Sequence, residues 1–159
     1  MAGALRQEFA WGAIEWLAGA EAGNAKELSL ARVSIAPGRA TDVHRHANCE
    51  ESIYVERGRV QCTLGAERAE LSDGGQAVVP RGAVHAIRNV GTEPARLILS
   101  YSSAAREFEL AGPLAQNSPA RRRRREIHAR GLDETVGVIR AVGGRIGRRR
   151  GKPDGDCEK

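Results

Sequence analysis

Short hydrophobic runs recur along the first two thirds of this chain, and polar turn residues separate them. The runs have strand length and are rich in aliphatic and β-branched residues; they span residues 28–37, 51–56, 59–65, 75–80, 83–90 and 95–102. The segments between them carry turn sequences such as APGR, SDGG and GTEP. No period of 3.6 residues crosses this region, which disfavours helices. The pattern predicts an all-β body, built as an antiparallel sandwich or barrel.

One connection can be predicted in more detail. Between residues 51 and 64, hydrophobic and polar positions alternate on both sides of Arg57 and Gly58. Such a pattern is typical of a β-hairpin, in which Gly58 is free to adopt a positive φ angle. We therefore expect the two flanking runs to pair with each other.

The charge distribution divides the chain into two parts. Residues 1–110 contain 12 Lys and Arg against 14 Asp and Glu, a net charge of −2, whereas residues 111–159 contain 13 against 6, a net charge of +7. Residues 111–120 read AGPLAQNSPA, a composition typical of linkers. The sequence thus predicts one domain at 1–110, including an N-terminal strand region, a linker at 111–120 and a basic tail at 121–159.

The basic tail has two arginine-rich blocks, at residues 121–125 and 147–152. Blocks of this kind bind phosphates by releasing counterions, so nucleic-acid contact is an alternative for this segment. The favoured interpretation is a solvated, flexible tail, because it lacks the aromatic residues on which bases stack. Partial helical spacing between residues 127 and 139 is interrupted by glycines, so a helix there is expected only on docking.

Composition also bears on compartment and assembly. The three cysteines show no CxxC spacing, and no apolar run is long enough to span a bilayer. The start of the chain lacks a basic segment followed by an apolar one. These features predict a soluble, cytoplasmic protein. The apolar, aromatic segment FAWGAIEW at residues 9–16 could cover the edge strand of a neighbour, which predicts a homodimer.

Potential metal ligands gather in one short stretch. Two residues apart on a strand, His44 and His46 share a face, and Glu51 begins the next hydrophobic run across a short loop. Two imidazoles and a carboxylate form an incomplete metal site, which calls for a further ligand from another strand. Another histidine, His85, lies on a separate predicted strand.

At these residues the chain resembles the cupins, over residues 28–102. The first cupin motif is matched by Gly38, His44, His46, Glu51 and Gly58. The second is matched by Gly74, Pro80, Gly82, His85 and Asn89. The resemblance implies a jelly-roll β-barrel that holds a divalent metal ion through His44, His46, Glu51 and His85.

Three imidazoles and one carboxylate leave two positions of an octahedron open. Such a set suits Fe, Mn, Ni or Co, with Zn and Cu as further candidates. Strand alternation turns Glu50 away from Glu51 and toward the surface. It also turns a set of small or aliphatic residues inward, Ile53, Val55, Ala83 and Ile87, so we expect a mostly aliphatic pocket and a substrate with an apolar body and a chelating end.

These observations favour a metal-dependent enzyme acting on a small organic molecule, with a non-haem dioxygenase-type oxidoreductase placed first. The alternatives are a metal-dependent isomerase, lyase or cyclase, and a cupin that binds a metabolite without catalysis. No catalytic acid or base is assigned; Asp42 and Glu50 are candidates by proximity only. Cys49 is expected to be a partly exposed thiol, and Asn89 either orients a ligand or forms a turn.

Overall fold

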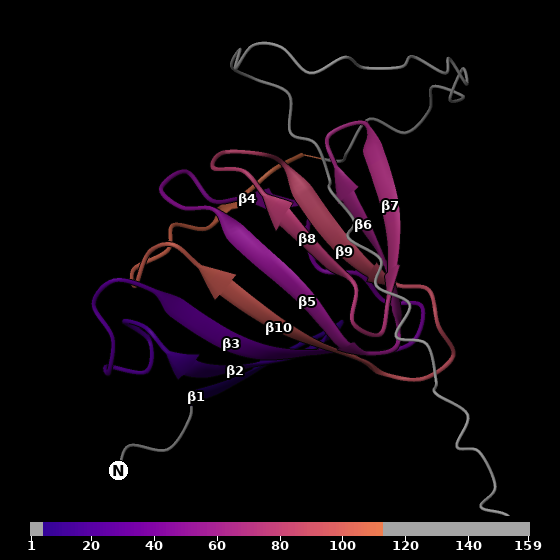
Figure 1. The fold of residues 1–159 in the computed structure, drawn as a ribbon, viewed down its shortest axis with the longest axis horizontal. Coiled ribbons are helices and arrows are strands. Elements are labelled where there is room, and N and C mark those ends of the chain that lie inside the picture. Colours follow the sequence, from indigo (N-terminus) through magenta and orange to yellow (C-terminus); the bar gives the residue numbers. More distant parts are fainter. Residues whose placement is uncertain (1–4, 113–159) are drawn as a thin grey trace, which may run out of the picture.

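The computed structural model describes residues 5–112, and within this range the chain forms strands and no helix (Figure 1). The strands are β1 (Leu5–Phe9), β2 (Gly12–Ala18), β3 (Ser29–Ile35), β4 (His44–Arg45), β5 (Glu51–Arg57), β6 (Arg59–Leu64), β7 (Glu67–Ser72), β8 (Gln76–Val79), β9 (His85–Asn89), β10 (Ala95–Tyr101) and β11 (Glu109–Leu110). Each of the six predicted runs overlaps one of them. The predicted all-β fold is therefore confirmed.

The strands form two antiparallel sheets that face each other. One sheet has the order β1-β2-β3-β10-β5-β8, and the other has the order β11-β4-β9-β6-β7. Among the described strands no ladder joins one sheet to the other, so hydrogen bonding does not close them into a continuous barrel. The architecture is a two-sheet sandwich, which corrects the expected barrel while retaining the packed, all-antiparallel arrangement.

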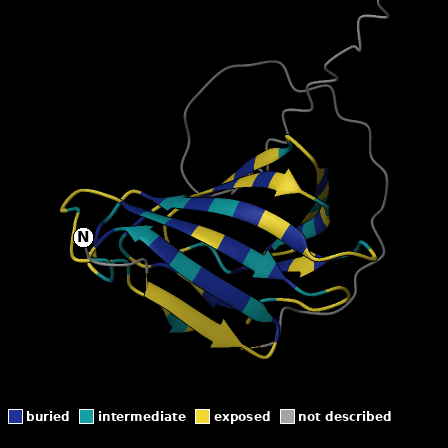
Figure 2. Cartoon of the chain, turned by 90° about the horizontal axis from the view of Figure 1, so that it is seen from below, coloured by how far each residue is buried: buried dark blue, intermediate teal, exposed yellow. Residues whose placement is uncertain are grey.

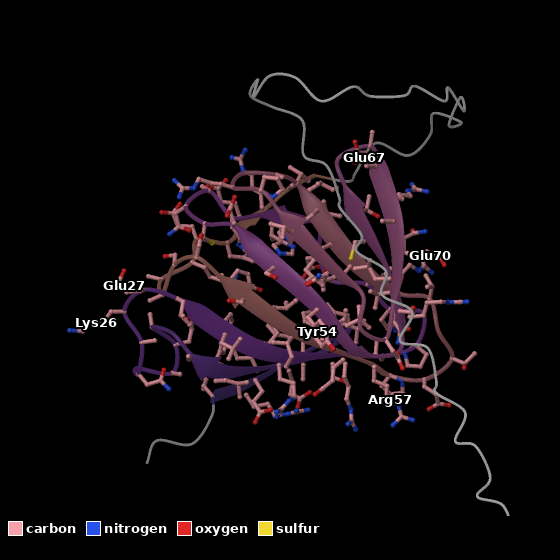
Figure 3. The ribbon with its side chains drawn as sticks, viewed as in Figure 1. Lys26, Glu27, Tyr54, Arg57, Glu67 and Glu70 are labelled. Atoms are coloured by element: carbon pink, nitrogen blue, oxygen red, sulfur yellow. The ribbon has the colours of Figure 1, made fainter. Side chains whose placement is uncertain are left out.

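The core lies between the two sheets. Along β3 and β10 buried and less buried residues alternate, as one covered face requires, and Figure 2 shows the bands this produces. In β5 the alternation places Glu51, Ile53 and Val55 inside and leaves Tyr54 45% exposed (Figure 3). The inward direction predicted for these three residues is confirmed.

The predicted hairpin at Arg57 and Gly58 is wrong. β5 belongs to the six-stranded sheet and β6 to the five-stranded sheet, so the chain crosses from one sheet to the other at Gly58. The positive φ expected for Gly58 is present, at 104°. A Cβ atom there would lie 3.0 Å from Cα of Ala95, which explains the glycine. Alternation on both sides of a turn does not distinguish a hairpin from a corner between two sheets.

Several strands have no strong hydrophobic signal. β7 is mostly exposed, and its Glu67 and Glu70 point outward (Figure 3). β4 and β11 are two residues each and pair with one another.

Within residues 5–112 there is no helix that could cross a membrane.

The aromatic segment at residues 9–16 is largely used inside the subunit. β2 pairs with both β1 and β3, and Trp16 is completely buried. Of these three strands, β1 alone lies at an edge of its sheet, and all five of its residues are exposed. The predicted linker from residue 113 onward and the predicted basic tail lie outside the described residues.

Candidate metal site

Four potential metal ligands converge between the sheets. One ligand atom from each of His44, His46, Glu51 and His85 lies within 4.8 Å of the others. All four residues are buried, with exposed fractions between 1% and 7%. These are the four residues named from the sequence, and the structure brings all of them together.

Strand pairing explains how distant residues meet. His44 in β4 lies directly opposite His85 in β9, and their ring centroids are 4.2 Å apart. Glu51 is the first residue of β5 in the other sheet, where it pairs with Val79 and Tyr101. The site is therefore built across the two sheets, at the end where β4, β5 and β9 begin.

Backbone carbonyls orient the three histidine rings. In each ring Nδ1 lies within hydrogen-bond distance of a carbonyl oxygen: 2.8 Å to Asp42 for His44, 2.6 Å to Glu107 for His46, and 2.9 Å to Ala83 for His85. An Nδ1–H that donates to a carbonyl leaves Nε2 as the nitrogen with a free lone pair. Metal-binding histidines are commonly oriented in this way.

The lone pairs left on Nε2 face a carboxylate. Oε2 of Glu51 lies 2.9 Å from Nε2 of His85 and 3.2 Å from Nε2 of His46. With both Nδ1 atoms donating to carbonyls, these contacts join acceptor to acceptor unless a proton or a cation lies between them. Three imidazole nitrogens and one carboxylate oxygen around a buried point are a donor set that fits a divalent transition-metal ion.

The electrostatics of the cluster keep Glu51 ionised. Burial would raise the pKa of Glu51, but hydrogen bonds from His46 and His85, together with their charges, outweigh it and lower the pKa to about 2. Burial likewise acts to lower the pKa of His85, yet the hydrogen bond and charge of Glu51 raise it overall. In the absence of a metal, His85 is thus the histidine best placed to share a proton with Glu51.

His44 behaves differently from His85. Burial, followed by the neighbouring His85, lowers the pKa of His44 from 6.5 to about 4. His44 is therefore neutral at pH 7, which is the form that binds a metal.

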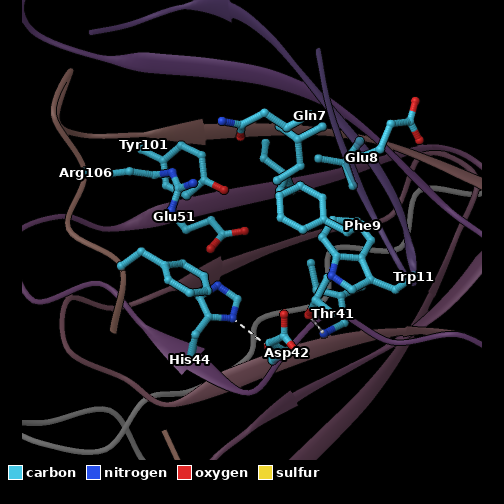
Figure 4. A pocket seen from close by; sticks show the side chains of 15 residues that line it. Gln7, Glu8, Phe9, Trp11, Thr41, Asp42, His44, Glu51, Tyr101 and Arg106 are labelled. Carbon is cyan, nitrogen blue, oxygen red and sulfur yellow. Dashed lines mark hydrogen bonds between the residues drawn. The ribbon is translucent and has the colours of Figure 1, made fainter. Parts of the chain in front are cut away.

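A cavity of about 480 Å³ opens beside these residues (Figure 4). Its wall contains His44 and Glu51, together with Gln7, Glu8, Phe9, Trp11, Ile14, Val33, Thr41, Asp42, Ile87, Leu99, Tyr101, Arg106 and Phe108. The expectation of a mostly aliphatic wall is only partly met. Ile87 lines the cavity as predicted, whereas Ile53 and Val55 belong to the core and four aromatic residues stand in the wall.

The sequence analysis assigned no site role to Arg106 or Tyr101. The Arg106 guanidinium carbon lies 4.6 Å from the ring centroid of Trp16 and 5.2 Å from that of Tyr101. Tyr101 meets His46 edge to face at 5.2 Å, and burial, followed by the charge of Glu51, raises its pKa well above the usual value. Arg106 follows the last hydrophobic run, where no local pattern marks it as inward.

The remaining candidates take structural or peripheral positions. Glu50 is exposed, as expected, and Asp42 lies at the cavity wall. Cys49 is 1% exposed, so the expectation of a partly exposed thiol is wrong, and its pKa is raised by burial and then by Glu51. Asn89 is fully buried and bonds to the backbone of Ile35, Glu93 and Gly91, which makes it a structural residue.

Comparison with known proteins agrees with this architecture. Residues 31–101 match the family described as the Cupin domain. The structure of the Lactobacillus farciminis oxalate decarboxylase formate complex superposes with a TM-score of 0.62, at 23% identity over 67% of this chain and 33% of that chain. This likeness is one of fold. The match over residues 31–101 includes both motifs and supports the resemblance of this part of the chain to the cupin superfamily.

Two relatives share more sequence with the chain. Germin-like protein 3-8 of Oryza sativa subsp. japonica is 35% identical over 85 residues, which are 50% of this chain and 38% of that protein. Polyketide synthase CurC of Streptomyces cyaneus is 33% identical over 84 residues, which are 53% of this chain and 54% of that protein. The chain thus spans about two fifths to about half of the length of these relatives.

Proposed function

We propose that this protein is a divalent-metal-dependent enzyme acting on a small organic molecule, with a dioxygenase-type oxidation as its favoured reaction. One observation carries the proposal: two members of the buried ligand cluster, His44 and Glu51, form part of the wall of a 480 Å³ cavity. A small molecule in that cavity would lie beside the metal position, whereas a purely structural metal site is closed to ligands.

In this proposal His44, His46, Glu51 and His85 hold the ion. Four protein donors leave two octahedral positions open, a number that suits Fe, Mn, Ni or Co, with Zn and Cu as further candidates. When bound, a divalent ion supplies Lewis acidity to a chelating oxygen, and a redox-active ion also supplies the electron transfer that O₂ chemistry requires.

The residues of the chain provide the setting for this chemistry. The carbonyls of Asp42, Glu107 and Ala83 keep the three Nε2 atoms turned inward. The aromatic and aliphatic side chains of the wall displace water and give an apolar body a surface on which to pack. This combination favours a flat, largely apolar substrate with an oxygen-bearing end directed at the metal.

A second candidate is a metal-dependent isomerase, lyase or cyclase. Asp42 supports it, because it lies in the cavity wall near His44 and is a carboxylate available as a general base (Figure 4). A relative named as a polyketide synthase protein points in the same direction. A cupin that binds a metabolite without catalysis is the remaining alternative.

Metal analysis followed by oxygen measurement separates these functions. We would purify the full chain without an affinity tag, determine its metals by mass spectrometry, and record O₂ consumption with aromatic chelating compounds. A redox-active metal with substrate-dependent O₂ uptake supports the oxygenase. Turnover without O₂ uptake, lost in Asp42→Asn, supports the Lewis-acid reaction. Protein that binds ligand without any turnover contradicts both enzymatic functions.

We also propose the setting in which this enzyme works. Residues 1–110 act as the metal-binding domain, residues 111–120 as a linker and residues 121–159 as a basic tail that is not needed for the chemistry. The protein is proposed to be a cytoplasmic homodimer. Nucleic-acid contact through the tail is the less favoured role.

A further inference from the structure

Arg106 is held at the cavity wall by aromatic rings. It lies between β10 and β11, and its guanidinium carbon is 4.6 Å from the centroid of Trp16, 5.2 Å from that of Tyr101 and 5.5 Å from that of Phe108. Figure 4 shows its guanidinium group close to Tyr101 at one side of the cavity. Stacking on aromatic rings restrains the guanidinium. Its N–H groups lie in the plane of the group, so they remain able to donate hydrogen bonds at its edge.

This arginine has no acidic partner among residues 5–112. The ion pairs of that range do not include Arg106, and its Nε is buried without a hydrogen-bond partner. A buried donor without a partner is costly, so a positively charged side chain in this state calls for an acceptor that the described chain does not provide. Glu21 also has a buried oxygen without a partner, and it is the alternative acceptor to test.

The opposite side of the cavity is flat and apolar. Phe9 and Trp11 stack with ring centroids 4.8 Å apart and an interplanar angle of 6°, and Figure 4 places them across the cavity from Arg106. Nε1 of Trp11 is another buried donor without a partner in residues 5–112. The cavity wall therefore combines an aromatic surface with a cation that has no acidic partner among residues 5–112.

We infer that Arg106 is a specificity-determining residue that binds the carboxylate of the substrate, so that the enzyme acts on aromatic carboxylic acids. A guanidinium binds a carboxylate through two parallel N–H···O bonds, which orients the acid as well as attracting it. The aromatic body of such a ligand would pack against Phe9 and Trp11. The inference rests on the proposed function for the reaction, but the binding step depends only on residues of this chain.

Binding to the metal-free protein tests the inference. The full chain, treated with chelator, would be titrated with benzoate and with benzamide, a neutral molecule of nearly the same shape. The chain contains two tryptophans, Trp11 in the cavity wall and Trp16 against Arg106, so their fluorescence reports on this region. We expect benzoate to bind roughly 10- to 100-fold more tightly than benzamide, the range that hydrogen bonds to a charged group provide.

Two substitutions identify the residue responsible. Arg106→Gln should reduce benzoate affinity to that of benzamide, and Arg106→Lys should give an intermediate affinity because it keeps the charge but loses the paired donors. Arg32→Gln is the matched control, since Arg32 is paired with Glu15 away from the cavity wall. Metal content by mass spectrometry should be unchanged in all three variants.

Three results would overturn the inference: no benzoate binding by the unaltered chain, equal affinity for benzoate and benzamide, or full benzoate binding by Arg106→Gln. If Arg106 serves only as a partner for Glu21, Arg106→Gln and Glu21→Gln will lower the unfolding temperature alike while benzoate binding persists. Different results would refute the proposed function: variants of the four metal-ligand residues that keep their metal, or the absence of turnover. Arg106-dependent benzoate binding would survive that failure.

Discussion

Oε2 of Glu51 lies 2.9 Å from Nε2 of His85, although 34 positions separate the two residues in the chain. Glu51 begins β5 in the six-stranded sheet, and His85 begins β9 in the five-stranded sheet. The contact therefore links the two halves of the sandwich. An ion held by both residues would tie the sheets together, so metal binding and folding stability should be coupled.

Removing one histidine should reduce both metal content and stability. For His44→Ala and His85→Ala we expect a loss of bound metal on dialysis and a lower unfolding temperature. The stability lost should be about 3 to 4 kcal/mol if the ion is present at roughly 100 to 1,000 times its Kd. Mass spectrometry and calorimetry measure the two effects.

The matched control for these histidines is Arg45→Gln. Arg45 stands between His44 and His46 but is exposed, and it pairs with Glu109 at the surface. This variant should keep its metal and lose less than about 1 kcal/mol. Full metal occupancy in both histidine variants after dialysis would contradict the assignment.

The metal-free protein should lose stability as the pH falls from 6.5 to 4. In this window the unfolded chain protonates His44 near its ordinary pKa of 6.5, whereas the folded chain resists until a pKa of about 4. The unfolded state thus binds more protons, and stability decreases with falling pH by up to about 3 kcal/mol. Urea unfolding at several pH values measures the slope.

His44→Gln should flatten this slope. His85 has a raised pKa in the folded chain and acts in the opposite direction. The stability that it contributes is fully present below its unfolded-state pKa and is lost as the pH rises through its folded-state pKa. The contribution of Glu51 disappears only as the pH falls from 4.5 to about 2. Equal slopes in the variant and the unaltered chain would show that His44 is not the group responsible.

The exposed edge of β1 predicts how a homodimer forms. Antiparallel pairing of two β1 strands, centred on Gln7, would set Arg6 opposite Glu8 of the partner subunit and Leu5 opposite Phe9 of the partner subunit. Leu5 and Phe9 are 43% and 42% exposed in the single chain. Opposite charges and apolar residues facing each other stabilise strand pairs. Sedimentation at micromolar concentration should give about twice 17.1 kDa.

Charge reversal tests the register of this dimer. Arg6→Glu would place like charges opposite each other and should shift the protein to a monomer, whereas Arg6→Glu combined with Glu8→Arg should restore the dimer. The pair is exposed within one strand, so the fold itself should tolerate both changes. A monomer of 17.1 kDa for the unaltered chain would refute the dimer, and no rescue by the double variant would refute the register.

Truncation should separate the chemistry from the basic tail. We expect a chain ending after Leu110 to remain folded and metal-loaded; a chain ending after Gly112 also keeps the hydrogen bond from Ala111 to the carbonyl of Val43. Any nucleic-acid affinity should vanish with the tail, and in the full chain it should fall steeply as salt rises. Unfolding or metal loss in both truncated chains would show that the tail contributes to the domain.

Asn89 offers a test of structure without chemistry. Its side-chain amide donates to the carbonyls of Ile35 and Glu93, and its oxygen accepts from the N–H of Gly91. Asn89→Ala would leave these buried groups unpaired and should cost about 2 to 4 kcal/mol. Chemical unfolding measures the loss, and metal content should stay unchanged at low temperature. Metal loss in the folded variant would assign Asn89 a role at the site.

The strands that could be predicted are those that bury alternate residues. β3, β5, β6, β8, β9 and β10 each carry an apolar set on one face, because each covers the core. β7 covers little of it and has one buried residue, so a polar sequence suffices there. Which strands pair was not predictable from the same pattern. The corner at Gly58 shows why, since a strand buries the same side chains whether its neighbour in sequence lies beside it or in the opposite sheet.

The sequence by itself determined the all-β class and the four candidate ligands, because alternation and motif spacing are local and each ligand stands at a strand end or just beyond one. The tertiary structure decided what surrounds those ligands. Arg106, Phe9 and Trp11 reach one cavity only because the β1–β2 hairpin at the edge of one sheet and the segment before β11, an edge strand of the other sheet, line the same cavity. No spacing rule links these segments. Their meeting depends on how the two sheets pack, which is the sum of many weak contacts distributed along the chain.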